Sequence, residues 1–239
     1  DPFNPRWVYS SSTGLGLQRV DVETGDRMPI RPAPPPGDTV AYRFDWLAPV
    51  LASRHTKGVV YAGGNRLFIS RDHGLSWSRT EDLTRRVNRD TLRIMGVLGS
   101  DIRISRNDGE SNFSEITTIG ESPLDGQVLW VGTDDGNVQV SRDGGATWSE
   151  VSRGIQGVPS GTFVSRVVAS SAGRGVAYAT FDGHRSGDFE PYAFRTTDFG
   201  RTWAKVTAGL PSGDVVRTIN EYPGQPGVAF VGTERALFL

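Results

Sequence analysis

The sequence SRDHGLSW, from Ser70 to Trp77, recurs as SRDGGATW from Ser141 to Trp148 and as TTDFGRTW from Thr196 to Trp203. The three copies share the pattern Ser/Thr-x-Asp-x-Gly-x-Ser/Thr-Trp. A catalytic motif normally occurs once per active site, whereas a phrase that recurs along one chain is typical of a structural repeat. We therefore interpret the three copies as parts of a repeated fold.

The similarity extends upstream of each motif. Residues 58–69, 127–140 and 175–181 each contain a short run of β-branched and aromatic residues, and residues 227–239 begin a further copy. Each unit is predicted to hold short strands separated by Gly, Asp and Asn. Four antiparallel strands per unit, repeated every few tens of residues, are typical of β-propeller blades. The sequence thus predicts an all-β fold of four-stranded antiparallel blades.

Every shared position of the motif has a role in a hairpin turn. The Asp carboxylate can accept hydrogen bonds from backbone N–H groups of the turn, and the Gly allows a positive φ. The Ser or Thr before the Trp can bind the turn from its other side, and the Trp packs on the blade. We predict this structural role for Ser70, Asp72, Gly74, Ser76, Trp77, Ser141, Asp143, Gly145, Thr147, Trp148, Thr196, Asp198, Gly200, Thr202 and Trp203.

The repeats predict that residues 1–239 form one β-propeller section. The predicted blade units are residues 1–32 (partial), 41–80, 114–151, 163–206 and 214–239 (partial). Residues 81–113 would form an inter-blade insert, in which residues 104–109 resemble a motif copy without its Trp. The first unit lacks a leading strand and the last lacks a final strand. We therefore expect this to be an incomplete section of a larger propeller.

Composition argues against several classes of protein. The chain has 239 residues with 26 Lys and Arg and 27 Asp and Glu, so no excess of positive charge attracts nucleic acid. No apolar run is long enough to span a membrane, and no cysteine is present. The three histidines, His55, His73 and His184, have no second ligand at metal-binding spacing. We predict no cofactor-binding and no metal-binding residue.

The three motifs resemble Asp boxes, also called bacterial neuraminidase repeats. Residues 42–49, YRFDWLAP, together with residues 74–77 and 81–84, resemble bacterial sortilin-like and xyloglucanase-like propeller proteins. The resemblance covers most of the chain, and it implies a periplasmic, cell-surface or secreted location. Because Asp-box propellers carry unrelated activities, the resemblance implies the architecture and no single function.

An Asp-box enzyme would need further residues. A sialidase needs an early Arg-Ile-Pro motif, whereas residues 28–32 read MPIRP, in a different order. A xyloglucanase-like hydrolase needs two carboxylates across a cleft. Asp134 and Asp135 are adjacent carboxylates, but a turn between two strands explains them. No catalytic residue is assigned.

The longest insert within a unit, residues 182–188, is the candidate binding loop. Loops at the faces of a rigid scaffold commonly carry binding residues. The polar side chains of this loop are Asp182, His184, Arg185 and Asp188. The same composition also fits a flexible solvent-exposed loop, so the sequence leaves both interpretations open.

The functional prediction is a non-catalytic protein-binding or scaffolding propeller. It would be an accessory subunit of a larger extracytoplasmic assembly, with another protein as its partner. The alternative is a carbohydrate-active propeller, either a glycoside hydrolase or a glycan-binding protein, whose catalytic carboxylates lie largely outside this chain.

Overall fold

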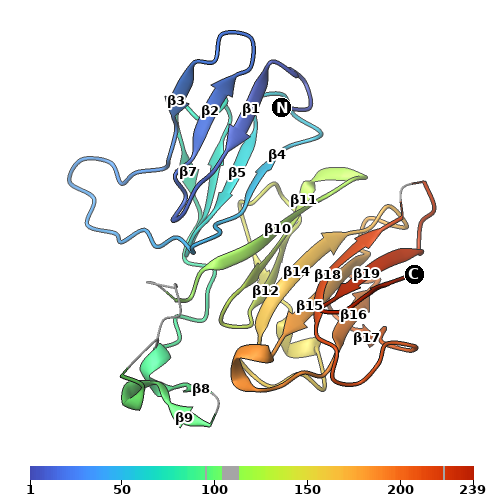
Figure 1. The fold of residues 1–239 in the computed structure, drawn as a ribbon. Helices are drawn as coiled ribbons and strands as arrows, with labels where there is room; N and C mark the ends of the chain where they lie inside the picture. The colour runs from blue at the N-terminus through green and yellow to red at the C-terminus, as the bar shows by residue number, and fades with distance from the viewer. Residues whose placement is uncertain (95, 104–112, 223) are drawn as a thin grey trace.

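Short antiparallel strands make up most of the regular secondary structure of the chain (Figure 1). The computed structural model describes residues 1–94, 96–103, 113–222 and 224–239. Residues 104–109, where a motif copy without its Trp was predicted, lie outside these ranges. The helical elements of the described residues are short 3-10 helices: η1 Arg89–Thr91, η2 Gly99–Asp101, η3 Ser152–Gly154 and η4 His184–Ser186.

The described strands form five sheets in sequence, which we call blades one to five, and one hairpin between blades two and three. Blade one contains β1 (Trp7–Ser10), β2 (Gln18–Asp21) and β3 (Arg27–Pro29); blade two contains β4 (Val50–Ala52), β5 (Val60–Gly63), β6 (Leu67–Ser70) and β7 (Ser78–Arg79). The hairpin contains β8 (Arg93–Ile94) and β9 (Val97–Leu98).

The remaining blades follow the same sequential order of strands. Blade three contains β10 (Ile116–Ser122), β11 (Asp125–Thr133), β12 (Val138–Ser141) and β13 (Ser149–Glu150); blade four contains β14 (Phe163–Ala169), β15 (Ala177–Asp182), β16 (Tyr192–Thr196) and β17 (Ala204–Lys205). Blade five contains β18 (Val216–Glu221), β19 (Ala229–Thr233) and β20 (Leu237–Phe238). The all-β class and the four-stranded antiparallel blades predicted from the sequence are confirmed.

The second strands of the four-stranded blades are buried on both faces. In β11 the run Val128–Val131 is fully buried, and Trp130 lies opposite Val140 of β12. A continuous apolar run is what a strand needs when another sheet covers each of its faces. The aromatic residue of each unit therefore forms part of the core between blades.

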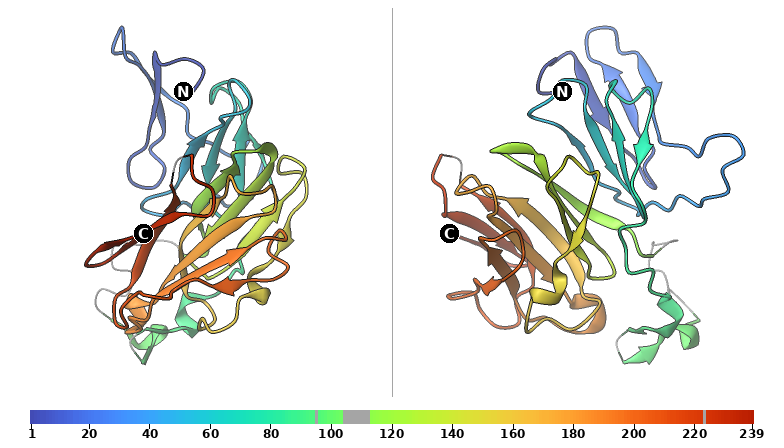
Figure 2. Two further views of the ribbon diagram at one scale, coloured as in Figure 1. Left: turned by 90° about the vertical axis from the view of Figure 1, so that its right-hand side faces the viewer. Right: turned by 180° about the vertical axis from the view of Figure 1, so that it is seen from behind.

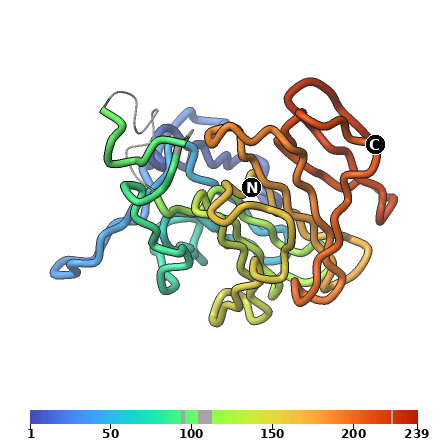
Figure 3. The backbone as a smooth tube through the Cα atoms, turned by 90° about the horizontal axis from the view of Figure 1, so that it is seen from below, coloured from blue at the N-terminus to red at the C-terminus, as the bar shows by residue number. Residues whose placement is uncertain are grey.

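Each blade packs on the next through an apolar layer of its own. Blades three and four share the largest layer, which includes Trp130 and Phe194. The first strands β10, β14 and β18 lie side by side (Figures 1 and 2). The Thr117 hydroxyl donates to the Val164 carbonyl at 2.7 Å, which links β10 to β14. Seen from below, the chain runs from blades one and two on the left to blade five on the right (Figure 3).

Each motif joins the last two strands of its blade and has the same internal hydrogen bonds. In blade two the Ser70 hydroxyl donates to Asp72 at 2.8 Å and accepts from the Gly74 N–H at 2.7 Å. Asp72 also accepts from the N–H and the hydroxyl of Ser76, at 2.8 and 2.5 Å. The corresponding bonds recur around Asp143 and Asp198. The bonds from Ser76 favour the charged carboxylate and lower the pKa of Asp72 to about 2.

The motif also packs on the preceding blade, a contact that the sequence did not reveal. Trp77 Nε1 donates to the Ile30 carbonyl of blade one at 2.9 Å. Trp203 Nε1 donates to the Val151 carbonyl, at the end of blade three, at 3.2 Å. The motif glycines have φ between +80° and +94°, and a Cβ on Gly200 would lie 2.7 Å from the Val151 Cβ. Glycine is therefore required both by the turn and by the neighbouring blade.

Replacing a motif glycine tests this inter-blade contact. Gly200→Ala places a side chain at φ +80° against Val151, whereas Gly157→Ala does so at φ +83° with nothing within 4 Å. The positive φ destabilises both variants by about 1–2 kcal/mol. Overpacking against Val151 should lower the free energy of unfolding of Gly200→Ala by about 1–3 kcal/mol more. Urea denaturation measures both values, and equal losses would show that the motif does not press on the preceding blade.

Acid should weaken the motif turns. The folded pKa of Asp72 is about 2, below the value of about 3.9 in an unfolded chain. Its charge therefore contributes stability that is present above about pH 4 and is lost as the pH falls towards 2. Asp72→Asn should be less stable than the unmodified chain at pH 7 but should show a flatter decline between pH 4 and pH 2. Urea denaturation at each pH gives the free energy of unfolding. If this free energy fell equally in Asp72→Asn and in the unmodified chain between pH 4 and pH 2, the lowered pKa of Asp72 would be contradicted.

Candidate functional site

A cavity of about 340 Å³ lies between the insert and blades three and four. The loop of residues 159–162 and helix η4 form its blade-side walls, and β8 of the insert contacts η4. The side chains that line it are Arg89, Leu92, Arg93, Phe113, Asp134, Pro159, Ser160, Thr162, Phe163, Asp182, Arg185, Ser186 and Asp188. Residues far apart in the sequence thus meet at one end of the blades.

The predicted binding loop lies at this cavity. Asp182, Arg185 and Asp188 line the 340 Å³ cavity, while His184 lines an adjacent cavity of about 230 Å³ together with Arg217. The loop turns back because the Asp188 N–H donates to the Gly183 carbonyl at 3.1 Å. The structure therefore brings the four side chains to one region of the surface.

Two carboxylates of this loop are bound by neighbouring groups. Asp182, which is 8% exposed, lies 2.6 Å from His184 Nδ1 and accepts a hydrogen bond from Arg217. Asp188 accepts from the Tyr192 hydroxyl at 2.8 Å and from the Glu190 N–H at 3.1 Å. Burial and this hydrogen bond to Asp188 raise the pKa of Tyr192 to about 12. Both carboxylates thus hold the loop in place.

The cavity is also lined by positively charged arginine and apolar aromatic side chains. The guanidinium carbon of Arg185 lies 5.8 Å from the ring centroid of Phe163, and that of Arg89 lies 5.6 Å from the ring of Phe113. Arg93 adds a third positive charge to the lining. Cations at such distances are attracted to aromatic faces, and a guanidinium group can also bind a carboxylate with two parallel hydrogen bonds. The cavity lining therefore combines the apolar rings of Phe113 and Phe163 with guanidinium groups.

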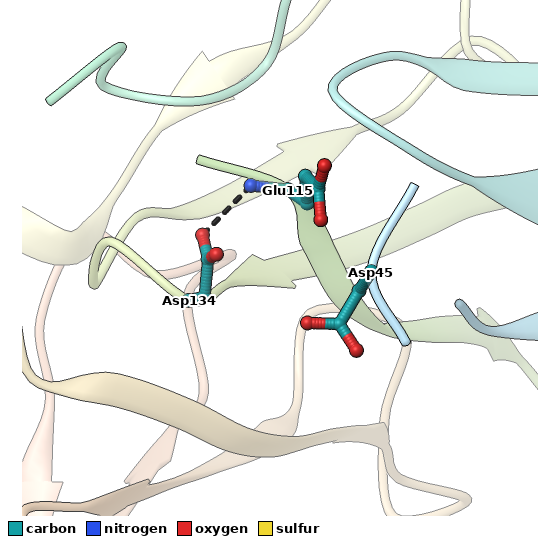
Figure 4. A group of neighbouring side chains, drawn as sticks. All are labelled: Asp45, Glu115 and Asp134. Carbon is teal, nitrogen blue, oxygen red and sulfur yellow. Dashed lines mark hydrogen bonds between the residues drawn. The ribbon is translucent and has the colours of Figure 1, made fainter. Parts of the chain in front are cut away.

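Three carboxyl groups lie close together (Figure 4), and one of them, that of Asp134, also lines the cavity. We call Asp45, Glu115 and Asp134 the acidic cluster; one donor atom from each lies within 4.8 Å of those of the other two. Asp45 precedes β4, Glu115 precedes β10 and Asp134 follows β11, so blades two and three bring them together. The Asp134 carboxylate accepts from the Glu115 N–H at 2.7 Å. Of the described residues, these are the ones whose carboxyl oxygens could hold a metal ion.

Burial governs the protonation of the acidic cluster. Glu115 is 0% exposed, and its burial and the nearby Asp45 raise its pKa to about 8. Burial also raises the pKa of Asp134 well above its ordinary value. Desolvation disfavours the charged form of a carboxyl group, which explains both shifts.

Sequence reasoning missed two members of this cluster. Asp45 and Glu115 lie in loops before strands. Asp45 belongs to the stretch YRFDWLAP, which indicated a family resemblance but no metal or catalytic role, and no local motif marks Glu115. Asp134 was explained by a turn, together with Asp135. Asp135 does serve the turn, because it accepts from the Thr133 hydroxyl at 2.5 Å and from the Arg85 N–H at 2.8 Å. Asp134 differs, since its Oδ2 is buried with no hydrogen-bond partner among the described residues.

A family model for the BNR/Asp-box repeat matches residues 139–150, which contain the whole second motif copy, the end of β12 before it and β13 after it. No curated protein sequence matches the chain. Among the described residues, no helix combines the length and hydrophobicity needed to span a membrane.

Several solved structures are similar to the chain in fold. The GH74 xyloglucanase from Xanthomonas campestris has a TM-score of 0.62 and 17% identity, covering 97% of this chain and 32% of its own. The extracellular domain of BT3049 from B. thetaiotaomicron has a TM-score of 0.60 and 13% identity, covering 97% of this chain and 26% of its own. The Dos1 propeller has a TM-score of 0.56 and 12% identity, and the match covers 96% of this chain and 56% of the Dos1 chain.

This chain spans about a third of the length of the xyloglucanase that it matches. At these identities the similarity establishes the fold alone. The recurrent Asp-box turns, the successive four-stranded sheets and the propeller structures that match them agree with one another. The chain carries the BNR/Asp-box repeat on a section of a β-propeller whose fold resembles that of the GH74 xyloglucanase.

Proposed function

We propose that this propeller section is a non-catalytic protein-binding surface whose binding site is the 340 Å³ cavity. The observation that supports binding over hydrolysis is the state of the cavity carboxylates. Asp182 and Asp188 are engaged by Arg217, His184 and Tyr192, and Asp134 is 3% exposed. A glycoside hydrolase needs two carboxyl groups that can reach a glycosidic bond from opposite sides.

The partner that best fits the cavity is an acidic segment of another protein. Arg89, Arg93 and Arg185 line the cavity, and Phe113 and Phe163 supply apolar contact area. An Asp or Glu side chain of the partner can pair with a guanidinium group, while its methylene groups contact the rings. Charge complementarity of this kind selects the partner and orients it.

The wider role that we propose is that of a scaffold or accessory subunit in an extracytoplasmic assembly. Rigid blades hold the cavity loops in fixed positions, which limits the ordering cost when a partner binds. The similarity in fold to the extracellular domain of BT3049 supports a periplasmic, cell-surface or secreted location. A carbohydrate-active role is the second candidate, supported by the similarity in fold to the GH74 xyloglucanase.

Site-specific photo-crosslinking in the native source tests the protein-binding proposal. A benzophenone amino acid replaces Phe163 in the cavity and, as a matched control, the exposed Phe3 near blade one. We expect position 163, and not position 3, to crosslink one protein, and mass spectrometry should locate the crosslink in a segment rich in Asp and Glu. A crosslink to a segment without acidic residues would contradict the proposed charge complementarity.

Substitution of the cavity arginines tests the same proposal through the measured affinity for a peptide. For a peptide copied from the crosslinked segment, Arg93→Ala and Arg185→Ala should each weaken binding by about 2–10-fold at low salt. Arg27→Ala, on the exposed strand β3 of blade one, should leave the affinity unchanged. Absence of a protein crosslink, together with release of reducing ends from xyloglucan oligosaccharides by the purified chain, would favour the carbohydrate-active alternative.

A further inference from the structure

The acidic cluster contains a carboxyl group that the fold buries without a partner. Glu115 is 0% exposed, and neither of its carboxylate oxygens has a hydrogen-bond partner among the described residues. Asp134 Oδ2 is in the same situation. Buried polar groups in native proteins are normally hydrogen-bonded, so carboxyl oxygens in this position are suited to bind a further polar group, a water molecule or an ion.

The neighbouring arginine does not complete the cluster. Arg43 acts on Glu115 through its charge, but its Nη2 donates to the Ser114 carbonyl at 3.1 Å and lies 3.4 Å from Asp82. The one guanidinium group that acts on Glu115 is therefore already shared with Asp82. Burying several carboxylates together is strongly unfavourable unless protons or a cation neutralise them.

We propose that Asp45, Glu115 and Asp134 bind one calcium ion. Their donor oxygens lie within 4.8 Å of one another and surround a common space (Figure 4). Calcium binds oxygen ligands at about 2.3–2.6 Å, so oxygens on opposite sides of the ion are about 5 Å apart. One ion can therefore contact all three groups with little movement of the backbone. Magnesium fits less well, because it requires shorter distances and near-octahedral geometry.

The position of the cluster indicates both the entry route and the effect of the ion. Asp134 also lines the 340 Å³ cavity, which connects the cluster to the surface. Asp45 belongs to the segment that leads into β4, whereas Glu115 and Asp134 flank β10 and β11. A bound ion would thus link blade two to blade three. This inference is independent of the partner proposed above, because it uses no partner residue.

Calcium titration of the chain after removal of metals with EDTA tests the proposal. Isothermal titration calorimetry should detect one ion per chain. The Tm should rise with calcium, by about 5–10 °C at a concentration a hundredfold above the Kd. A Tm and a heat signal that do not change with calcium would overturn the proposal, and a response to magnesium or manganese without one to calcium would overturn the assignment of the ion.

Variants establish whether the response comes from the acidic cluster. Glu115→Gln should weaken calcium binding at least tenfold and abolish the calcium-dependent rise in Tm, each variant being compared with itself in EDTA. Asp45→Asn, at a partly buried residue, gives the same test if Glu115→Gln does not fold. Glu81→Gln is the matched control, because the Glu81 side chain is 91% exposed and lies outside the cluster. If Glu115→Gln or Asp45→Asn showed the same calcium-dependent rise in Tm as the unmodified chain, the proposed site would be overturned.

Discussion

The contact between each Asp-box turn and the preceding blade is the constraint on which the arrangement of the blades depends. Within its own blade the turn is closed by hydrogen bonds to one carboxylate, as around Asp72. Its outer surface meets the neighbour, where Trp77 reaches the Ile30 carbonyl and Gly200 lies against Val151. One short motif therefore closes a hairpin and also positions its own blade against the preceding one. Repetition of the motif converts this local geometry into a regular succession of blades.

The cavity exists because that succession is interrupted between blades two and three. The insert departs after β7, and its β8 strand contacts η4 of blade four, well beyond the blade that follows it in the sequence. The loops of a rigid scaffold can differ in sequence while the scaffold keeps its shape. The residues that line the 340 Å³ cavity accordingly come from the insert and from the loops of blades three and four, and not from the repeated motif.

Much of the fold could be predicted because its signals are local. The apolar run around Trp130 predicts a buried strand, and the positions of Asp143 and Gly145 predict the turn that follows β12. The candidate loop of Asp182, His184, Arg185 and Asp188 was identifiable as an unusually long insert, but its association with Arg217 and Phe163 was not. Nothing in the sequence indicated that Asp45 and Glu115 would meet, because each is a single carboxylate in a loop and they are 70 residues apart in the chain.

The sequence by itself determined the class of fold, the repeated turn and the order of the strands. These features follow from hydrogen bonds and apolar patterns within a few tens of residues, so they can be derived without knowing what the blades contact. Only the tertiary structure decided that the insert faces blade four and that Asp45, Glu115 and Asp134 converge. Those contacts depend on how entire blades pack against one another, and the burial that changes the pKa of Glu115 exists only after they have packed.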